Sequence, residues 1–210
     1  MTKKDSPEPT VFRSLGLGAL CETLQAAVTC DILELGPVRG DSIEFWAQYK
    51  PSVYIADLRS CLPLPAIAEN PDDLETPEPD WGNILALPAD RHFDVILAWD
   101  LLNYLDLAAA ASLIRYLSRF CRSGTKFFAL MFDQKEMPEE ITVYRIVDQG
   151  RLRYDCGSPA MRACPRHQPR ALTGIMHQFR TSNSFRLHNG MVEYLFSYEA
   201  HSQRICADAC

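Results

Sequence analysis

The fold is decided by the stretch Asp31-Ile-Leu-Glu-Leu-Gly-Pro-Val-Arg-Gly-Asp41 and by the run Val53-Tyr-Ile-Ala-Asp57 that follows it. Both contain continuous apolar runs, which are typical of parallel strands buried on both faces. Two glycines in the first stretch permit a tight turn, and Asp41 with Glu44 has the capping-box spacing that begins a helix. The pattern predicts a strand, a turn, a helix and a second strand, the repeating unit of an open α/β sheet.

The polar residues of this unit gather where its strands end. Asp57 lies 21 residues after Gly36, close to the position where an acid at the second strand's tip meets ribose hydroxyl groups. A carboxylate suits that role because it can accept hydrogen bonds from two neighbouring hydroxyls. Ligands of open α/β sheets lie beyond the carboxyl ends of the strands, so the spacing indicates a nucleoside-binding crevice there.

The segment Glu34-Leu-Gly-Pro-Val-Arg-Gly40 resembles the first motif of the class I S-adenosylmethionine-dependent methyltransferases. In that family an apolar strand and an acid precede Gly-x-Gly-x-Gly, and a common variant reads Glu-Leu-Gly-Pro-Gly-x-Gly. Here Val38 replaces the middle glycine, in a loop whose backbone passes close to the cofactor in the family. Its side chain therefore either tilts away from the site or obstructs it. The resemblance covers most of the chain from about Cys30 onward.

The resemblance implies a Rossmann-like methyltransferase fold, which is a three-layer α/β/α sandwich with a mostly parallel seven-stranded sheet closed by an antiparallel hairpin. It also implies S-adenosylmethionine as the cofactor. The cofactor-binding residues carried over by resemblance are Glu34, Gly36, Gly40, Asp57, Asn83 and Trp99. The segment 61–80 departs from the family pattern, because its prolines and acids indicate a loop where the family has a helix and a third strand.

Asn83 enters the candidate site through the segment that runs from Trp81 to Pro88. This segment resembles one in the family that ends in Leu-Pro and in which an Asp or Asn contacts the adenine edge. Asn83 holds that position, and an amide can both donate and accept hydrogen bonds, as an adenine edge requires. In the alternative interpretation Asn83 is an ordinary turn residue.

A fourth strand is predicted from Phe93 to Trp99, followed by Asp100-Leu-Leu-Asn103-Tyr104. Its tip is the place where, in the family, the acceptor and the transferred methyl group meet. Asp100 and Asn103 are therefore the candidate catalytic residues, which would orient an acceptor, while Trp99 and Tyr104 would line the pocket. In the alternative interpretation the two aromatic residues belong to the core and Asp100 caps a helix.

The remaining elements follow from the spacing of apolar residues. Spacings of three and four predict helices, and short apolar runs between turn residues predict strands. The predicted helices are Val11–Val28, Leu107–Cys121 and Ala171–Thr181. The predicted strands are Lys126–Phe132, a pair within Ile141–Tyr154, and Met191–Tyr198, which belongs to the closing hairpin.

Length and composition predict one domain. The chain has 210 residues, of which 47% are hydrophobic. We expect a flexible leader at residues 1–10, a single methyltransferase-like domain at 11–200 and a loose tail at 201–210. No apolar run reaches the length of a membrane span and the N-terminus lacks the apolar core of a signal peptide, so a cytoplasmic protein without a membrane partner is expected. The eight cysteines form no Cys-x-x-Cys pair, which favours unpaired thiols and predicts no metal site.

Charge is unevenly distributed, which bears on the choice of partner. The formal net charge is −6, with an acidic surplus in residues 1–114 and a basic surplus in residues 115–190. The acidic total argues against nucleic acid, although the basic region keeps that partner open. The basic region is either a solvated surface or the place where an anionic substrate or partner binds. The partner expected on this basis is a small-molecule acceptor or a protein.

Two functions remain open, and the first is favoured. One is an active methyltransferase acting on a small molecule, which needs few catalytic side chains because methyl transfer from a sulfonium depends mainly on alignment. The other is a catalytically inactive methyltransferase-like protein that acts as a binding or partner subunit, as Val38 and the irregular segment 61–80 suggest. A nicotinamide dinucleotide enzyme is disfavoured because Gly-x-Gly-x-x-Gly is missing.

Overall fold

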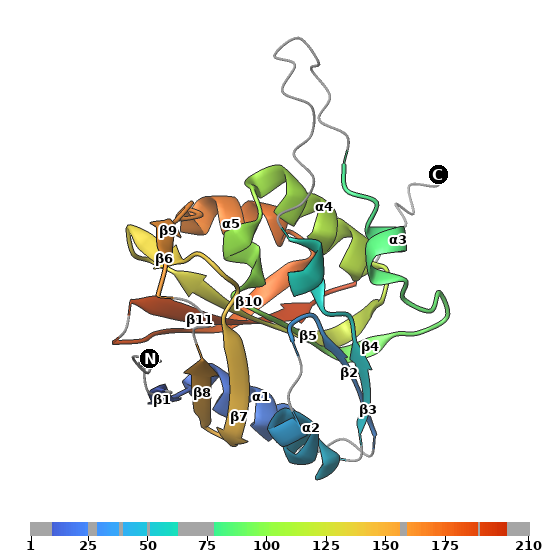
Figure 1. Cartoon of the computed structure of the whole chain (residues 1–210). Helices are drawn as coiled ribbons and strands as arrows, with labels where there is room; N and C mark the ends of the chain where they lie inside the picture. The colour runs from blue at the N-terminus through green and yellow to red at the C-terminus, as the bar shows by residue number, and fades with distance from the viewer. Residues whose placement is uncertain are drawn as a thin grey trace, which may run out of the picture.

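The computed structural model describes residues 10–24, 29–37, 40–49, 51–62, 78–155, 159–188 and 190–200. Within these ranges the centre of the molecule is a six-stranded sheet with the order β10-β11-β5-β4-β2-β3 (Figure 1). Four of its strands are parallel, while β11 runs antiparallel to β5 and β10 antiparallel to β11. In chain order the strands are β2 (Cys30–Glu34), β3 (Pro51–Ile55), β4 (Phe93–Trp99), β5 (Cys121–Phe132), β10 (Phe179–Arg186) and β11 (Met191–Tyr198).

The prediction of a mostly parallel sheet closed by an antiparallel hairpin is thus correct in kind, but the number of strands is wrong. The described part of the chain forms a mixed sheet of six strands, not seven. The family's third strand would fall in the segment 61–80, of which residues 63–77 lie outside the described residues. The parallel strands form where predicted, because their apolar runs can be buried on both faces.

The order of the strands reverses between β2 and β4. The chain leaves β2, passes through α2 (Gly40–Ala47) and returns beside β2 as β3. It then crosses to the other side of β2 and forms β4. A crevice forms outside the carboxyl ends of two strands where successive connections turn in opposite directions, and ligands of open α/β sheets bind there. The topology therefore places the candidate site at the tips of β2 and β4.

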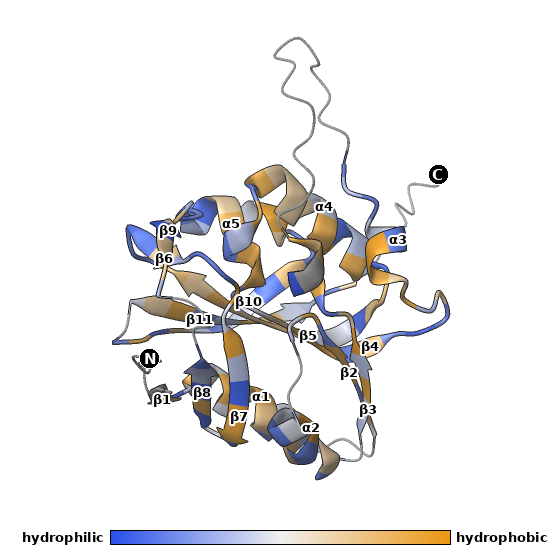
Figure 2. Cartoon of the chain, viewed as in Figure 1, coloured by the Kyte–Doolittle hydropathy of each residue, from blue (hydrophilic) through white to orange (hydrophobic). Residues whose placement is uncertain are grey.

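Helices cover both faces of the sheet (Figure 1). On one side lie α3 (Trp81–Leu85), α4 (Leu107–Ser118) and α5 (Pro169–Ile175), and on the other lie α1 (Leu15–Leu24) and α2. Successive strand residues point to opposite faces, so Ile96 packs with the first set of helices while Val95 and Leu97 pack with the second. Much of the strand and helix surface between the layers is apolar (Figure 2). The result is a three-layer sandwich with a core on each side of the sheet.

Two smaller antiparallel sheets, counted within the described ranges, extend this sandwich. One has the order β1-β8-β7 and consists of β1 (Thr10–Arg13), β7 (Val143–Asp148) and β8 (Arg151–Asp155). The other pairs β6 (Glu136–Pro138) with β9 (Met161–Ala163). Ile146 of β7 donates its N–H to the Ser42 hydroxyl in α2 at 3.3 Å, so the first small sheet packs across the beginning of α2.

Several predicted boundaries are corrected by long-range pairing. The single helix predicted over Val11–Val28 is β1 followed by α1, because Val11 and Phe12 pair with β8; residues 25–28 lie outside the described residues. The helix predicted over Ala171–Thr181 ends at Ile175, and β10 already begins at Phe179. The strand pair predicted near Gly150 is confirmed as β7 and β8, and the predicted helix from Leu107 as α4.

Some further predictions can be placed only in part. Of the predicted leader and tail, residues 1–9 and 201–210 lie outside the described residues, while Thr10 begins β1. Asp41 lies in the first turn of α2, which begins one residue earlier than the predicted cap, and it forms ion pairs with Arg145 and Arg153. The cysteines with a described environment are free thiols. Among the described residues, no helix is long and apolar enough to cross a membrane.

Candidate functional site

The turns after β2 and β3 are joined by backbone hydrogen bonds. Ala56 donates its N–H to the Glu34 carbonyl at 2.8 Å, and Leu58 donates to the Leu35 carbonyl at 3.1 Å. These bonds continue the parallel pairing of β2 with β3 past the end of the strands. Gly36 and Asp57 therefore lie on neighbouring turns at the same edge of the sheet, as their spacing in the sequence predicts.

Asp57 is an exposed carboxylate at the tip of β3. Its Oδ1 accepts the Arg59 N–H at 2.9 Å, and this bond caps the 3-10 helix η1 (Leu58–Cys61). The cap fixes where the carboxylate stands but leaves it at the surface. An exposed acid held in this way is suited to accept hydrogen bonds from the hydroxyl groups of a ligand.

The tip of β2 is closed by contrast. Glu34 is 3% exposed, and its Oε1 accepts both the Gly36 N–H, at 3.0 Å, and the indole N–H of Trp99. A Cβ added to Gly36 would lie 2.7 Å from Cδ1 of Trp99, which is shorter than real Cβ contacts allow. Gly36 thus permits a close approach to its backbone, and the group that makes this approach is the Trp99 side chain.

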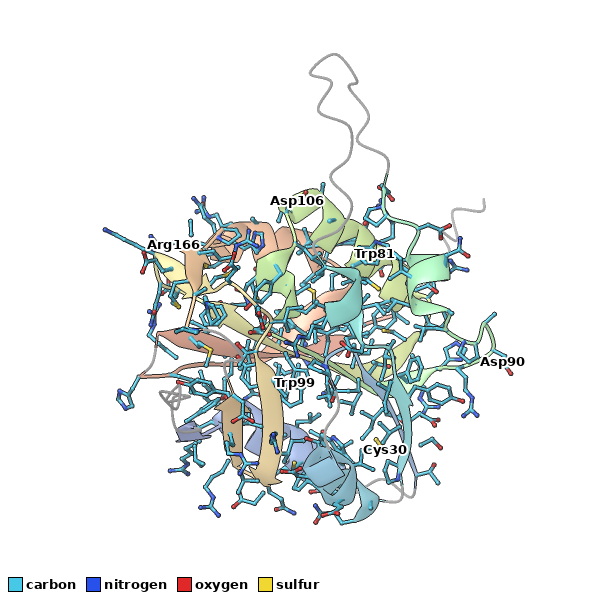
Figure 3. All side chains as sticks on the ribbon, in the orientation of Figure 1. Cys30, Trp81, Asp90, Trp99, Asp106 and Arg166 are labelled. Atoms are coloured by element: carbon cyan, nitrogen blue, oxygen red, sulfur yellow. The ribbon has the colours of Figure 1, made fainter. Side chains whose placement is uncertain are left out.

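Trp99 is held in place from several sides, near the centre of the molecule (Figure 3). Its backbone φ is 48°, a left-handed conformation that costs a residue with a Cβ about 1 kcal/mol. Its ring stacks on Tyr144 of β7, with centroids 5.3 Å apart and planes at 10°, and meets the edge of Phe128 at 5.7 Å. With 4% of its surface exposed, Trp99 fills the hollow above Gly36.

Asp100 follows Trp99 and is fully buried. Its Oδ2 accepts the Thr142 N–H at 3.3 Å and the Tyr144 hydroxyl at 3.5 Å, whereas Oδ1 has no hydrogen-bond partner among the described residues. Burial raises the pKa of Asp100 to about 7, although the bonds from Thr142 and Tyr144 act in the opposite direction. A carboxyl group with this pKa can gain or lose a proton near neutral pH.

The Glu34 carboxyl is perturbed in the same direction. Burial raises its pKa to about 8, against the lowering effect of the bonds from Trp99 and Gly36, and Asp57 adds a smaller repulsion. Glu34 is therefore largely protonated at neutral pH. Two buried carboxyl groups thus lie near Trp99: Glu34 accepts its indole N–H, and Asp100 contacts Tyr144, on which the indole stacks.

Asn103 has its polar side-chain atoms engaged by backbone. It lies in the 3-10 helix η2 (Leu101–Tyr104) and is 1% exposed. Its Nδ2 donates to the carbonyls of Asp100 and Leu130, at 2.7 and 2.8 Å, and its Oδ1 accepts the Phe132 N–H at 2.9 Å. The amide therefore ties the tip of β4 to β5 and fixes the turn that carries Asp100.

Asn83 and Gly40 each lie near the beginning of a helix. Asn83 is exposed at the start of α3, and its Nδ2 donates to Oδ2 of Asp80 at 2.6 Å. Gly40 begins α2, and a Cβ there would meet no atom of the described residues within 4 Å. Val38, which replaces the family's middle glycine, lies outside the described residues. The structure thus brings Glu34, Gly36 and Trp99 into contact and places Asp57 beside them.

Two residues that complete the site, one in β7 and one immediately before it, were not singled out by any pattern in the sequence. Thr142 and Tyr144 contact Asp100, and Tyr144 also stacks on Trp99, but they stand more than forty residues further along the chain. Nearby, a cavity of about 410 Å³ lies between the turns after β3 and β4, and its lining includes Arg59, Tyr104 and Arg162. Tyr104 therefore lines a cavity, as its position after the fourth strand predicts.

Comparisons with known proteins find similarity in structure only. No protein-family model and no curated protein matches the chain. A solved 1,6-didemethyltoxoflavin-N1-methyltransferase from Burkholderia thailandensis is 14% identical over 89% of this chain and 78% of that one, with a TM-score of 0.47. The N-methyltransferase NodS from Bradyrhizobium japonicum WM9 is 12% identical over 88% of this chain and 86% of that one, with a TM-score of 0.49.

A S-adenosylmethionine-dependent methyltransferase from Clostridium acetobutylicum is 11% identical over 88% of this chain and 90% of that one, with a TM-score of 0.48. The structures of the 1,6-didemethyltoxoflavin-N1-methyltransferase and of NodS contain S-adenosylhomocysteine.

Proposed function

We propose that this chain binds S-adenosylmethionine at the tips of β2, β3 and β4 and transfers its methyl group to a small-molecule acceptor. The observation that carries the proposal is the pair of hydrogen-bonded turns at the reversal of strand order, with Gly36 on one turn and the exposed Asp57 on the other. A crevice bordered by a glycine turn and a carboxylate is suited to an adenosine.

The two ends of this proposed site fit the cofactor unequally. At the rim, Asp57 would hold the ribose and Asn83 the adenine, since both side chains are exposed. At the inner end, Trp99 occupies the space against Gly36 and uses the Glu34 oxygen that faces it. The Trp99 ring must therefore move before a ligand can lie against the Gly36 turn, which continues toward Gly40. The cofactor, when bound, supplies an electrophilic methyl group on a sulfonium.

Asp100 and Asn103 take different roles in the proposal. Among the described residues, one buried oxygen of Asp100 has no hydrogen-bond partner, and burial raises the pKa of Asp100 to about 7, so it is suited to accept a proton from an acceptor hydroxyl or amine. Asn103 is a positioning residue, because its amide fixes the turn that carries Asp100. The cavity beside Tyr104 lies next to this turn and is the proposed place for the acceptor.

A second function is favoured by one observation, the filled hollow above Gly36. If Trp99 keeps this place, the chain is a methyltransferase-like protein without catalysis, which acts as a binding or partner subunit. In that case the contacts of Trp99 with Glu34 and Tyr144 only stabilise the folded chain. The two functions differ in whether an adenosyl ligand can displace the indole.

Calorimetric titration of the full chain with S-adenosylmethionine and with S-adenosylhomocysteine distinguishes the active methyltransferase from the inactive subunit. We expect micromolar binding accompanied by a shift in tryptophan fluorescence, because Trp99 must leave its stacked position. Asp57→Ala should weaken binding roughly 10- to 100-fold, since a hydrogen bond to a charged group contributes about 1.5–3 kcal/mol. Asp90→Ala is the matched control, because Asp90 is an exposed acid that precedes β4 and lies away from Trp99, which ends that strand (Figure 3).

Absence of binding to a folded sample would overturn the methyltransferase proposal in favour of the inactive subunit. Binding that survives Asp57→Ala unchanged would show that the ligand lies elsewhere. Methyl transfer itself would then be followed by incubating the chain with labelled S-adenosylmethionine and a set of small amines, phenols and carboxylates. Loss of transfer in Asp100→Asn with retained cofactor affinity is the result expected of a proton acceptor.

A further inference from the structure

A second cavity, of about 380 Å³, shares no lining residue with the cavity beside Tyr104. It is bordered by the end of β5, the loop that leads into α5, and the hairpin of β10 and β11. In the sheet, β5 and β4 separate β11 from β2. Arg166, which lines this cavity, lies on the far side of the molecule from Asp90 and well away from Trp99 (Figure 3).

The lining carries more positive than negative charge. Arg166 and Arg186 come from different elements, yet both guanidinium groups point to Asp133, at 3.7 Å and 2.5 Å. Each guanidinium has five N–H donors, and the ion pairs with Asp133 engage one nitrogen of each. Their side chains are 53% and 71% exposed, so the remaining donors face water or a ligand. One further negative charge would neutralise the pair of arginines.

The loop that carries Arg166 is held in a strained conformation. Arg166 has a φ of 48°, a left-handed backbone in which a residue with a Cβ is unfavourable. The next residue, His167, places Nε2 at 3.0 Å from the carbonyls of both Leu102 and Leu105. Because both partners accept, Nε2 carries the hydrogen, and the ring anchors the loop to η2 and the residue that follows it. Strain that is maintained by such anchoring is a feature of binding sites.

The walls of the cavity are apolar and aromatic. Val192 and the buried Met131 contribute aliphatic surface, and Tyr194 presents a ring that stacks on Phe196 with centroids 5.4 Å apart. The Tyr194 hydroxyl forms no hydrogen bond within the part of the chain that the structure describes. Burial and the nearby Asp133 raise the pKa of Tyr194, so this hydroxyl remains a donor at neutral pH.

We propose that this cavity binds a small organic monoanion, a carboxylate on a flat apolar body such as an aromatic ring. The carboxylate lies on the uncommitted N–H donors of Arg166 and Arg186, and the body lies against Tyr194 and Val192. A planar carboxylate matches the planar guanidinium, which can bind it through two parallel hydrogen bonds. This inference concerns a site separate from the one proposed for S-adenosylmethionine and stands without it.

Benzoate is the probe, followed on the full chain by saturation-transfer NMR and by titration. We expect saturation of the ring protons and millimolar or tighter binding, while benzylamine, which has the same ring but a positive charge, should not bind. Arg186→Gln should weaken benzoate binding about tenfold, because a charge-assisted hydrogen bond is lost. Arg180→Gln is the matched control, since Arg180 is also on β10 but pairs with Glu199 at 2.7 Å outside the cavity lining.

Arg166→Gly separates binding from folding. Glycine adopts the left-handed backbone without strain, so the melting temperature should stay the same or rise while benzoate binding weakens. The proposal is overturned if benzoate shows no saturation at its solubility limit. It is also overturned if Arg186→Gln and Arg166→Gly bind benzoate as the unchanged chain does, or if Arg180→Gln loses binding to the same extent.

Discussion

The tips of β3 and β2 are adjacent and opposite in character. Asp57 is exposed and its Oδ1 accepts one backbone N–H, whereas Glu34 is buried and accepts bonds from Gly36 and Trp99. In the sequence the two acids look alike, since each ends an apolar strand. The difference arises from Trp99, which reaches the β2 tip from β4 and seals it. An acid at a strand tip is therefore exposed or buried according to what the next strand places over it.

The first prediction concerns removal of the Trp99 side chain, which covers the tip of β2. Trp99→Ala should lower the free energy of unfolding by about 3–5 kcal/mol, because a buried indole is deleted and its stack on Tyr144 is lost. The same change empties the hollow above Gly36, so the affinity for S-adenosylhomocysteine should rise while stability falls. Chemical denaturation and calorimetry measure the two quantities on the same sample.

Trp81→Ala is the control for the expected loss of stability together with a gain in ligand affinity. Trp81 is also buried, and its indole donates to the Ser112 hydroxyl at 2.7 Å, but it packs on the opposite face of the sheet. Its removal should cost similar stability and leave ligand affinity unchanged. If Trp99→Ala lowers affinity as well, the indole belongs to the binding surface and does not obstruct it.

The second prediction compares two glycines of the same turn motif. Gly36→Ala forces a Cβ to within 2.7 Å of Trp99, which is fixed on three sides, so stability should fall by about 1–3 kcal/mol. The Cβ of Gly40→Ala meets no atom of the described residues within 4 Å, and the position lies in a helix, where alanine is favoured over glycine by up to about 1 kcal/mol. The melting temperatures of the two variants should therefore move in opposite directions. Equal effects would mean that Trp99 yields easily.

The sequence correctly predicted those strands and turns whose structure is determined by the residues within them. The apolar run from Phe93 to Trp99 forms β4, and the turn at Gly150 forms because its N–H donates to Asp148. The sequence failed where a partner far along the chain decides the structure. The spacing of apolar residues around Val11 predicted a helix, yet Val11 pairs with Arg153 and is a strand residue.

The candidate site also contains features that follow from local sequence and features that depend on residues far along the chain. The positions of Gly36 and Asp57 followed from their spacing, because parallel strands align their carboxyl ends. The position of Trp99 over Gly36 could not be predicted from the sequence. Its contacts with Glu34 and Tyr144 depend on a left-handed backbone angle at Trp99 and on the hairpin of β7 and β8. Asn103 was singled out for chemistry, but only the folded turn reveals that its amide bonds to three backbone groups.

The third prediction concerns pH. Glu34 and Asp100 have pKa values of about 8 and about 7 in the folded chain, above the ordinary values they have when unfolded. The folded state therefore binds their protons more tightly, and the stability they contribute is complete below the unfolded pKa and is lost as pH rises through the folded values. The melting temperature should fall between about pH 5 and pH 9.

Glu34→Gln and Asp100→Asn should each make this dependence on pH shallower, because each removes one titrating group. Glu199→Gln, a change at an exposed acid paired with Arg180, should leave the slope unaltered. Thermal melts at several pH values decide the matter. A slope that stays the same in both buried variants would mean that other groups titrate in this range.

The smallest expected effect tests whether the two tips are electrically coupled. The negative charge of Asp57 contributes to the raised pKa of Glu34, as the weakest of its causes, so Asp57→Asn should lower the pKa of Glu34 slightly. Trp99 reports this titration through its fluorescence, because its indole N–H bonds to the Glu34 carboxyl. An unchanged midpoint would mean that water at the exposed tip screens the charge completely, and the open and closed tips would then act as independent sites despite the backbone bonds that join them.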